Sequence, residues 1–357
     1  MSLHPLFGRL RRPVRREGAE GYLFLVLVSF ALTVIGTRWF LELTGFPRIG
    51  GGDLHIAHAL WGGAALFVAA LLPIVLAGRL VYRSAAILGG AGIGLFIDEV
   101  GKFITAENDY FFPAAAPIIY ATFLLSVIVW LRVRQPPEPD PRAQLLGALE
   151  LLEESVEGDL QRAEVDALCE RLRSAAEHAP AAEQRRLATH LLAFVGADAL
   201  RVAPDPVDRL GSLRAGWQSR ADAWLGGRGV RVGIVAALLL TGLGQVWALI
   251  SIATGLQLDP AGSLTAVGWF RILHLAVEAV AGLLVLAGGS LVAVVGRHRL
   301  GWTLAYVGLL VTITLGDLIG FYVRQFDSIL LVLGHLVLLA AVVGYRDELR
   351  AEVGRMS

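Results

Sequence analysis

The sequence predicts an all-α polytopic membrane protein with about eight transmembrane spans, arranged as two parallel four-helix repeats with a small cytoplasmic helical insert between them. Three observations lead to this prediction. Hydrophobic residues make up 55% of the 357 residues and charged residues 17%, with a mean hydropathy of +0.63. Apolar runs of about 20 residues recur, which is the length that crosses a hydrocarbon core of ~30 Å. The two halves also share a layout of polar residues.

Each apolar run is expected to form a helix, because lipid offers backbone N–H and C=O groups no hydrogen-bond partner. The predicted spans cover residues 21–44, 55–78, 85–104, 114–133, 232–254, 272–295, 301–321 and 328–345. The arginine-rich N-terminus resembles the start of a signal peptide. The apolar run after it is too long and lacks a small-residue cleavage site, so we expect an uncleaved first span.

Arginines lie mainly on the side of the spans that also holds the N-terminus. On this side are Arg79, Arg83, Arg132, Arg134, Arg228, Arg231, Arg297, Arg299, Arg346 and Arg350. Near the other side are Arg38, Arg48, Arg271 and Arg324. By the positive-inside rule, both termini and residues 135–227 are expected in the cytoplasm.

The segment after the fourth span has the composition of a soluble helical module. It opens with a proline-rich stretch, residues 135–141, which is typical of a stiff linker. Leucine and alanine then recur at helical spacing with charged residues between them, which predicts three amphipathic helices. These cover residues 142–157, 160–178 and 182–195. The module carries no phosphate-binding loop or catalytic motif, so we expect a regulatory unit or one that joins two copies as a homodimer.

Residues 206–225 carry Trp217 and Trp224 among arginines, which is typical of a helix that lies on the inner membrane surface. Three domains follow from this organisation. They are a first transmembrane four-helix half at 1–134, a cytoplasmic helical insert with an interfacial helix at 135–227, and a second transmembrane four-helix half at 228–357.

Composition also excludes some classes of function. Cys169 is the single cysteine, so the chain has no intrachain disulfide and no multi-cysteine metal site. A formal net charge of zero gives no argument for a nucleic-acid partner. The expected partners are the lipid bilayer and a small solute or proton.

Two residue types that the chain otherwise avoids lie close together. Lys102 is the only lysine among 31 basic residues, and Asn108 is the only asparagine. Both belong to the segment 96–112, in which Asp98, Glu99 and Lys102 end a predicted span. Ionisable groups at membrane depth are costly, which makes them functional candidates.

A repeated pattern links the two halves. In the first half, His58 opens the second span and Asp98-Glu-Val-Gly101 closes the third. In the second half, His274 opens the sixth span and Asp317-Leu-Ile-Gly320 closes the seventh. A repeat of four spans is even, so both copies would enter the membrane from the same side, as parallel transporter repeats do.

The predicted topology places these side chains in one layer near the outer face. His55 and His58 are three apart on one helix, whereas Asp98 and Lys102 are four apart and would share a face of another. The predicted site therefore consists of His55, His58, Asp98, Glu99, Lys102, His274, Glu278, Asp317 and His335.

Two kinds of chemistry suit this set. Histidines that titrate near neutrality, beside carboxylates at membrane depth, can take up and release protons during transport. Alternatively, His55, His58, Asp98 and Glu99 supply ligands for a divalent metal such as zinc, whose bound water would be a hydrolytic nucleophile. Lys102 counts against the metal, because an ammonium group beside the carboxylates competes with a cation. Lys102 is either the charge partner of a working carboxylate or an interfacial anchor paired with Glu99.

The residues also resemble a known group of proteins. The run Phe96-Ile-Asp-Glu-Val-Gly-Lys-Phe-Ile-Thr105 and Asn108-Asp-Tyr-Phe111, with His55 and His58 before Trp61-Gly-Gly63, is similar to a family of uncharacterised bacterial polytopic membrane proteins. The resemblance covers residues 55–112. It implies a bacterial inner-membrane location and no particular activity.

Proton- or ion-coupled transport of a small solute is therefore the first expectation for function. A membrane-embedded, metal-dependent hydrolase is the second. A sensor or assembly factor that acts through the cytoplasmic insert is the third, so the prediction leans away from an enzyme.

Overall fold

The computed structural model describes residues 14–45, 57–135, 140–157, 160–196, 228–254, 266–295 and 299–354. These residues form helices joined by turns, with no strand among them. Seven helical segments of the described part are long and apolar enough to cross a membrane, and the last of them, Arg299–Arg346, contains the seventh and eighth predicted spans. The chain divides into two compact units, residues 1–97 with 125–208, and residues 98–124 with 209–357.

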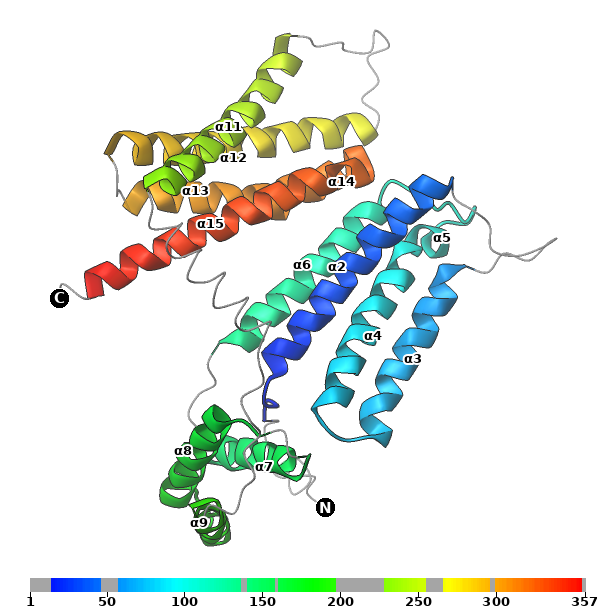
Figure 1. Cartoon of the computed structure of the whole chain (residues 1–357). Coiled ribbons are helices and arrows are strands. Elements are labelled where there is room, and N and C mark those ends of the chain that lie inside the picture. The colour runs from blue at the N-terminus through cyan, green and yellow to red at the C-terminus, as the bar shows by residue number, and fades with distance from the viewer. Residues whose placement is uncertain are drawn as a thin grey trace, which may run out of the picture. The chain divides into compact units, whose positions relative to one another are not determined.

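The long helices of the first unit follow the predicted apolar runs (Figure 1). They are α2 (Ala19–Thr44), α3 (His58–Val75), α4 (Arg79–Asp98) and the second part of α6 (Ala115–Arg134). Gly45 ends α2 in the left-handed conformation, and its N–H bonds to the carbonyls of Leu41 and Glu42. This is the usual way in which glycine terminates a helix.

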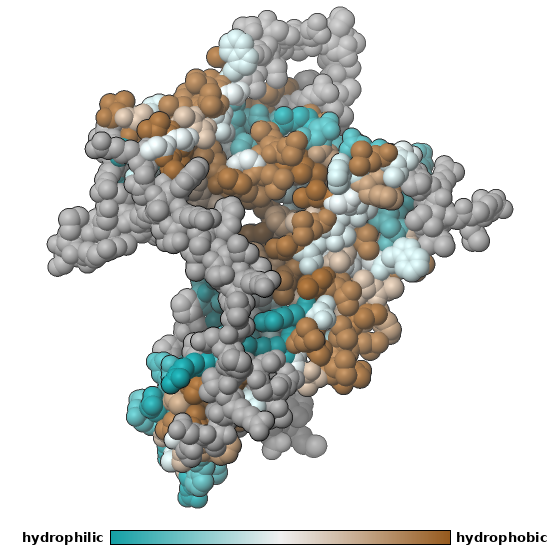
Figure 2. Space-filling model, in the orientation of Figure 1, coloured by the Kyte–Doolittle hydropathy of each residue, from teal (hydrophilic) through white to brown (hydrophobic). Residues whose placement is uncertain are grey.

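Close approach of backbones holds α3 and α4 together. A Cβ atom at Gly62 would lie 2.7 Å from the nitrogen of Phe96 and 2.8 Å from the carbonyl oxygen of Gly92. In lipid there is no hydrophobic driving force between helices, so membrane helices associate largely through van der Waals contacts. Small residues at the crossing allow the backbones to come close enough for such contacts. Large apolar side chains remain on the outside of the long helices, as the brown surface in Figure 2 shows.

The predicted insert helices are confirmed as α7 (Pro141–Glu157), α8 (Arg162–His178) and α9 (Ala182–Gly196). Their apolar faces meet in a core that includes Leu151, Leu168 and Leu172. A capping box at the start of α8, in which Glu164 accepts from the backbone of Gln161, supports that end of the helix. The predicted surface helix at 206–225 lies outside the described residues.

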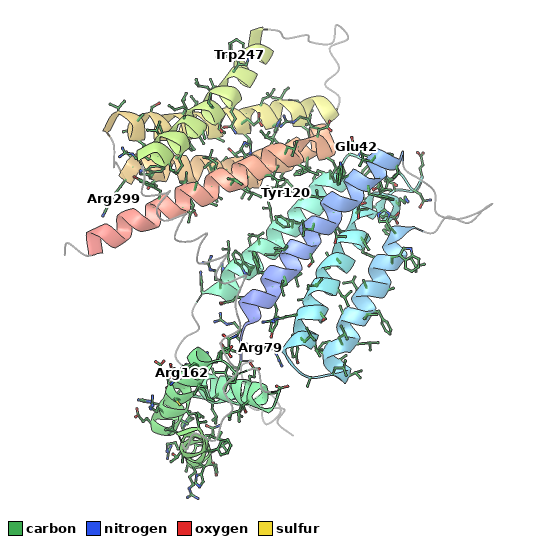
Figure 3. All side chains as sticks on the ribbon, in the orientation of Figure 1. Glu42, Arg79, Tyr120, Arg162, Trp247 and Arg299 are labelled. Atoms are coloured by element: carbon green, nitrogen blue, oxygen red, sulfur yellow. The ribbon has the colours of Figure 1, made fainter. Side chains whose placement is uncertain are left out.

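Ion pairs join the insert to the long helices of the first unit. Arg79, the first residue of α4 (Figure 3), lies 2.8 Å from Glu164 of α8, and Arg171 of α8 lies 2.6 Å from Glu17 before α2. The backbone N–H of Glu17 also donates to Glu150 of α7 at 2.7 Å. The insert is therefore part of the same compact unit as α2 and α4.

The second unit is built around α12. Its long helices are α11 (Arg228–Thr254), α12 (Ala266–Val295), α13 (Arg299–Val311) and α15 (Ile329–Gly354). Between α13 and α15 lie a π-helix η1 (Thr312–Gly316), α14 (Asp317–Arg324) and a 3-10 turn η2 (Gln325–Ser328). Gln325 has φ 49° and ψ −133°, a conformation rare outside glycine, and it ends α14. The core between α11, α12, α13 and α15 includes Leu238, Val285 and Trp302.

The short helix α5 (Val100–Ile104), the loop at 105–114 and the first part of α6 also belong to the second unit. Tyr120 of α6, labelled in Figure 3, packs its ring against Phe321 of α14 at a centroid distance of 4.7 Å. The third predicted span, 85–104, is thus divided, because the backbone of Glu99 (φ −93°, ψ 11°) separates α4 from α5.

Candidate functional site

The segment with the rare residues forms a compact turn at the end of α4. Asp98 is fully buried and accepts a hydrogen bond from the Tyr110 hydroxyl at 2.7 Å. Gly101 lets the loop at 105–114 return to α5, since a Cβ atom there would lie 2.6 Å from the carbonyl oxygen of Asp109. Thr105 accepts from the N–H of Asp109 and donates to the carbonyl of Gly101. These contacts give the segment a clear local structural role.

Asn108 has a structural explanation as well. Its φ of 54° lies in the left-handed region, which asparagine adopts more readily than most residues. The Asp109 carboxylate then accepts from the N–H of Phe111 at 2.9 Å, as aspartate does in tight turns.

Lys102 forms an ion pair with Glu99, three residues before it. The Lys102 Nζ lies 2.8 Å from Oε1 of Glu99, whose side chain is 1% exposed. The helix break at Glu99 separates Asp98 from Lys102, so the i,i+4 rule, which holds along one continuous helix, does not apply to these two residues. Of the two expected roles, this geometry favours a partner for Glu99 at the end of the span.

The remaining residues predicted from the first half are placed differently. His58 is the first residue of α3, in the first unit, whereas Asp98 belongs to the second. His55 lies outside the described residues. The shared site of His55, His58, Asp98 and Glu99 therefore stays a prediction. Among the described residues, no three His, Cys, Asp or Glu side chains are grouped so that they could hold a metal ion.

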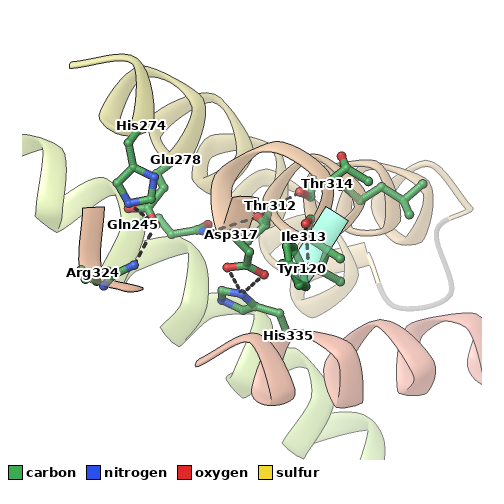
Figure 4. A network of polar contacts seen from close by, with 12 residues as sticks. Tyr120, Gln245, His274, Glu278, Thr312, Ile313, Thr314, Asp317, Arg324 and His335 are labelled. Carbon is green, nitrogen blue, oxygen red and sulfur yellow. Dashed lines mark hydrogen bonds and ion pairs between the residues drawn. The ribbon is translucent and has the colours of Figure 1, made fainter. Parts of the chain in front are cut away.

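The predicted residues of the second half do lie together, in the network of Figure 4. His335 of α15 points its Nδ1 at both carboxylate oxygens of Asp317, at 3.1 and 3.0 Å. The exposed fractions are 4% for His335 and 2% for Asp317. A buried carboxylate needs such a partner, because an isolated charge in an apolar interior is very costly.

A second pair lies on α12. His274 and Glu278 are one turn apart, and His274 Nε2 lies 3.3 Å from Glu278 Oε1. The guanidinium of Arg324, at the end of α14, lies 3.7 Å from the same oxygen. Gly320 faces this pair, since a Cβ atom there would lie 3.3 Å from Cε1 of His274. The buried Asp317 carboxylate is thus paired with His335, and the buried Glu278 carboxylate with His274 and Arg324.

The π-helix η1 lies directly before Asp317. Thr312, at its start, accepts a hydrogen bond from Gln245 of α11 at 3.1 Å, and the Ile313 carbonyl accepts from the Tyr120 hydroxyl at 2.9 Å. A π-helix contains one residue more than an α-helix needs, and such segments are frequent at functional sites. Tyr120 of α6 therefore holds the backbone of η1 before Asp317, and Gln245 of α11 holds the Thr312 hydroxyl at the start of η1.

These polar groups border a cavity of about 1200 Å³ between α11 and α15. Gln245, Glu278, Arg324 and His335 line one part of it. Most other lining residues are apolar or glycine, among them Ile234 and Leu338. Ligand cavities typically combine an apolar wall with a few convergent polar groups, so this is the candidate site.

The sequence pattern did not point to every member of the network. Gln245, Thr312 and Tyr120 are single polar residues within apolar helices. Arg324 was used only in predicting which ends of the spans face the cytoplasm. A polar residue in the middle of an apolar run is a usable signal, as Gln245 shows. Its partner could not be identified without the fold, because Gln245 and Thr312 are far apart in the chain.

Comparison with protein-family models, curated proteins and solved structures found no match for this chain.

Proposed function

We propose that the protein is an inner-membrane transporter that moves a solute together with protons, through the site between α11, α12, α14 and α15. The observation that carries the proposal is the buried His335–Asp317 pair at the edge of a large cavity. Histidine can change its charge near neutral pH, and a histidine–carboxylate pair inside a membrane is the usual form of a proton relay.

The position of the pair supports coupling. Asp317 follows η1 directly, and His335 lines the cavity, so a change in protonation would act on both the backbone of η1 and the cavity wall. When Asp317 takes up a proton, its attraction for a charged His335 is lost. The pair could then separate, which gives transport a two-state element that the solute can bias.

The wider picture is part of the proposal. We propose that both termini and the insert face the cytoplasm, and that the two halves arose as parallel four-helix repeats. The ion pairs of Arg79 and Arg171 with the neighbouring acids would transmit movements of α4 to the insert. A homodimer through the insert remains a further prediction.

The zinc-dependent alternative has less support. The Asp98 carboxylate already accepts from Tyr110, and Glu99 is paired with Lys102, so both carboxylates of the predicted ligand set are engaged. Metal analysis of the purified protein tests this alternative. Stoichiometric zinc that is lost in His58→Ala would favour the hydrolase over the transporter.

Transport can be tested in liposomes that contain the purified protein and a trapped pH-sensitive dye. A small-molecule extract of the host cell, added outside, should cause a protein-dependent pH change. Asp317→Asn should abolish this change, whereas Asp327→Asn, an exposed carboxylate on η2, should leave it intact. A pH change that persists in Asp317→Asn, or that never depends on the protein, would overturn the proposal.

A further inference from the structure

We propose that the cavity between α11 and α15 binds a membrane phospholipid, with an acyl chain between the two helices and the phosphate at Arg324. This inference rests on the proposed function, because it names the class of solute that the site would carry. Three features of the cavity lead to it: unfilled space beside glycines, an apolar wall as long as an acyl chain, and a cationic group with unused donors.

The first feature is the space beside the glycines of the cavity wall. Gly233 and Gly244 of α11 and Gly334 of α15 line the cavity, and a Cβ atom at any of them would meet nothing within 4 Å. By contrast, a Cβ atom at Gly242, on another face of α11, would lie 2.8 Å from the backbone nitrogen of Leu286. Gly242 is thus explained by helix packing, whereas the cavity glycines leave room that no described residue fills.

The second feature is the shape of the apolar wall. The cavity extends along α11 from Gly229 to Gln245, which corresponds to about 24 Å at ~1.5 Å rise per residue. Its volume of about 1200 Å³ exceeds that of most cavities for small polar ligands. Ile234, Ala237 and Leu338 offer such a ligand no hydrogen bond. A hydrocarbon chain matches both the length and the chemistry of this wall.

The third feature is the polar end. The Arg324 side chain is 45% exposed, and the one ion pair that it forms within the described part of the chain, with Glu278, is long at 3.7 Å. Most of its N–H donors are therefore available to oxygen atoms of a ligand. Guanidinium groups bind phosphate oxygens in a bidentate manner. His335, 4% exposed, lines the same end and uses Nδ1 for Asp317, which leaves Nε2 without a hydrogen bond to any described residue.

The arrangement also explains how a lipid would affect the proposed proton site. A phosphate at Arg324 would compete with Glu278 for the guanidinium and approach the His335 ring. Binding of the anion would favour a protonated His335, because opposite charges stabilise each other in an apolar environment. Lipid binding and proton binding would then be linked at one position of the cavity.

Photolabelling tests the inference. The full-length protein in liposomes is exposed to phosphatidylglycerol that carries a diazirine in its acyl chain, and labelled peptides are identified after irradiation. We expect labels on α11 and α15 around Ile234, Ala237 and Leu338. Gly233→Phe places a ring in the cavity from a position whose Cβ atom would meet nothing within 4 Å, and it should lower this labelling at least about tenfold. Leu243→Phe, at an exposed position of α11 that does not line the cavity, should not.

Arg324 provides the second arm. Arg324→Gln should lower labelling about tenfold, which corresponds to about 1.4 kcal/mol and agrees with the loss of one hydrogen bond to a charged group. Arg324→Lys should restore part of it. Equal labelling of wild type, Gly233→Phe and Arg324→Gln would overturn the inference. Disulfide-linked dimers through Gly233→Cys in a Cys169→Ser background would also overturn it, because they would assign the cavity to a helix of a second copy.

The result separates this inference from the proposed transport function. If labelling fails while the Asp317-dependent pH change persists, transport stands and the phospholipid is the wrong solute. If labelling depends on Arg324 and Gly233 but Asp317→Asn changes no flux, the cavity is a lipid site and coupled transport is wrong.

Discussion

The contact between His335 and Asp317 predicts a strong energetic coupling within the membrane part. The perturbation is a double-mutant cycle with Asp317→Leu, His335→Leu and the combined variant. Either single change leaves one buried polar group without its partner, whereas the double change replaces both with apolar side chains of similar size. Breaking a buried pair is far more costly than replacing it as a whole.

The magnitude follows from the geometry. Hydrogen bonds between transmembrane helices contribute about 0.6 kcal/mol on average and up to about 1.7. Hydrogen bonds to charged groups contribute ~1.5–3 kcal/mol. The His335 nitrogen contacts both carboxylate oxygens, at 3.1 and 3.0 Å, and the exposed fractions are 4% and 2%. We therefore expect a coupling free energy of about 1.5–1.7 kcal/mol, where these two ranges meet.

Reversible unfolding in mixed micelles of lipid-like detergent and sodium dodecyl sulfate measures the four free energies. The ion pair between Arg79 and Glu164 serves as the reference, because its side chains are 30% and 21% exposed and pairs of this kind contribute about 0.5 kcal/mol. If the costs of the two single variants simply add, to within about 0.3 kcal/mol, the reasoning about a desolvated pair is refuted.

Three further predictions concern other parts of the chain. Gly101→Ala should destabilise the turn between α4 and α6 by about 1–3 kcal/mol, because its Cβ atom would meet a backbone carbonyl, and this is measured as faster proteolysis of the loop at 105–114. Gly63→Ala should be neutral, since nothing lies within 4 Å of its Cβ atom. Lys102→Met should lower the free energy of unfolding by about 1–3 kcal/mol, because the Glu99 carboxylate, 1% exposed, would lose its partner. Lys102→Arg should keep most of the wild-type stability, and equal stability of the two variants would contradict this role of Lys102. Arg171→Gln should weaken the attachment of the insert to the residues before α2 by about 0.5 kcal/mol, measured as greater protease sensitivity of the insert at low salt. The difference from wild type should vanish near 1 M salt, and a difference that salt does not affect would argue against an ion pair.

The local structure was largely predictable from the sequence. Helices of the insert begin and end within about two residues of the prediction, because their amphipathic spacing has a clear period and their ends carry turn residues. The apolar runs likewise predicted the long helices. The break at Glu99 was not predictable, since hydropathy averages over many residues and does not respond to the φ and ψ angles of one of them. The π-helix at Thr312 was unpredicted for the same reason.

The candidate site divides in a similar way. Each ionisable residue in an apolar run was identifiable from its cost in the membrane, so His274, Glu278, Asp317 and His335 were predicted individually. His274 and Glu278 lie on one helix, and their contact follows from the i,i+4 spacing. Asp317 and His335 lie on different helices, and their pairing depends on the turn at Gln325, which no periodicity indicates.

From the amino-acid sequence it was predictable that the chain is helical, that most of it is apolar enough to cross a membrane, and which polar residues are unusual there. These properties depend on composition and on spacing along one helix. The tertiary structure was needed to show that Lys102 pairs with Glu99, that Gln245 bonds to Thr312, and that a cavity lies between α11 and α15. Such pairings depend on how helices cross, and crossing is set by the contacts of many side chains together.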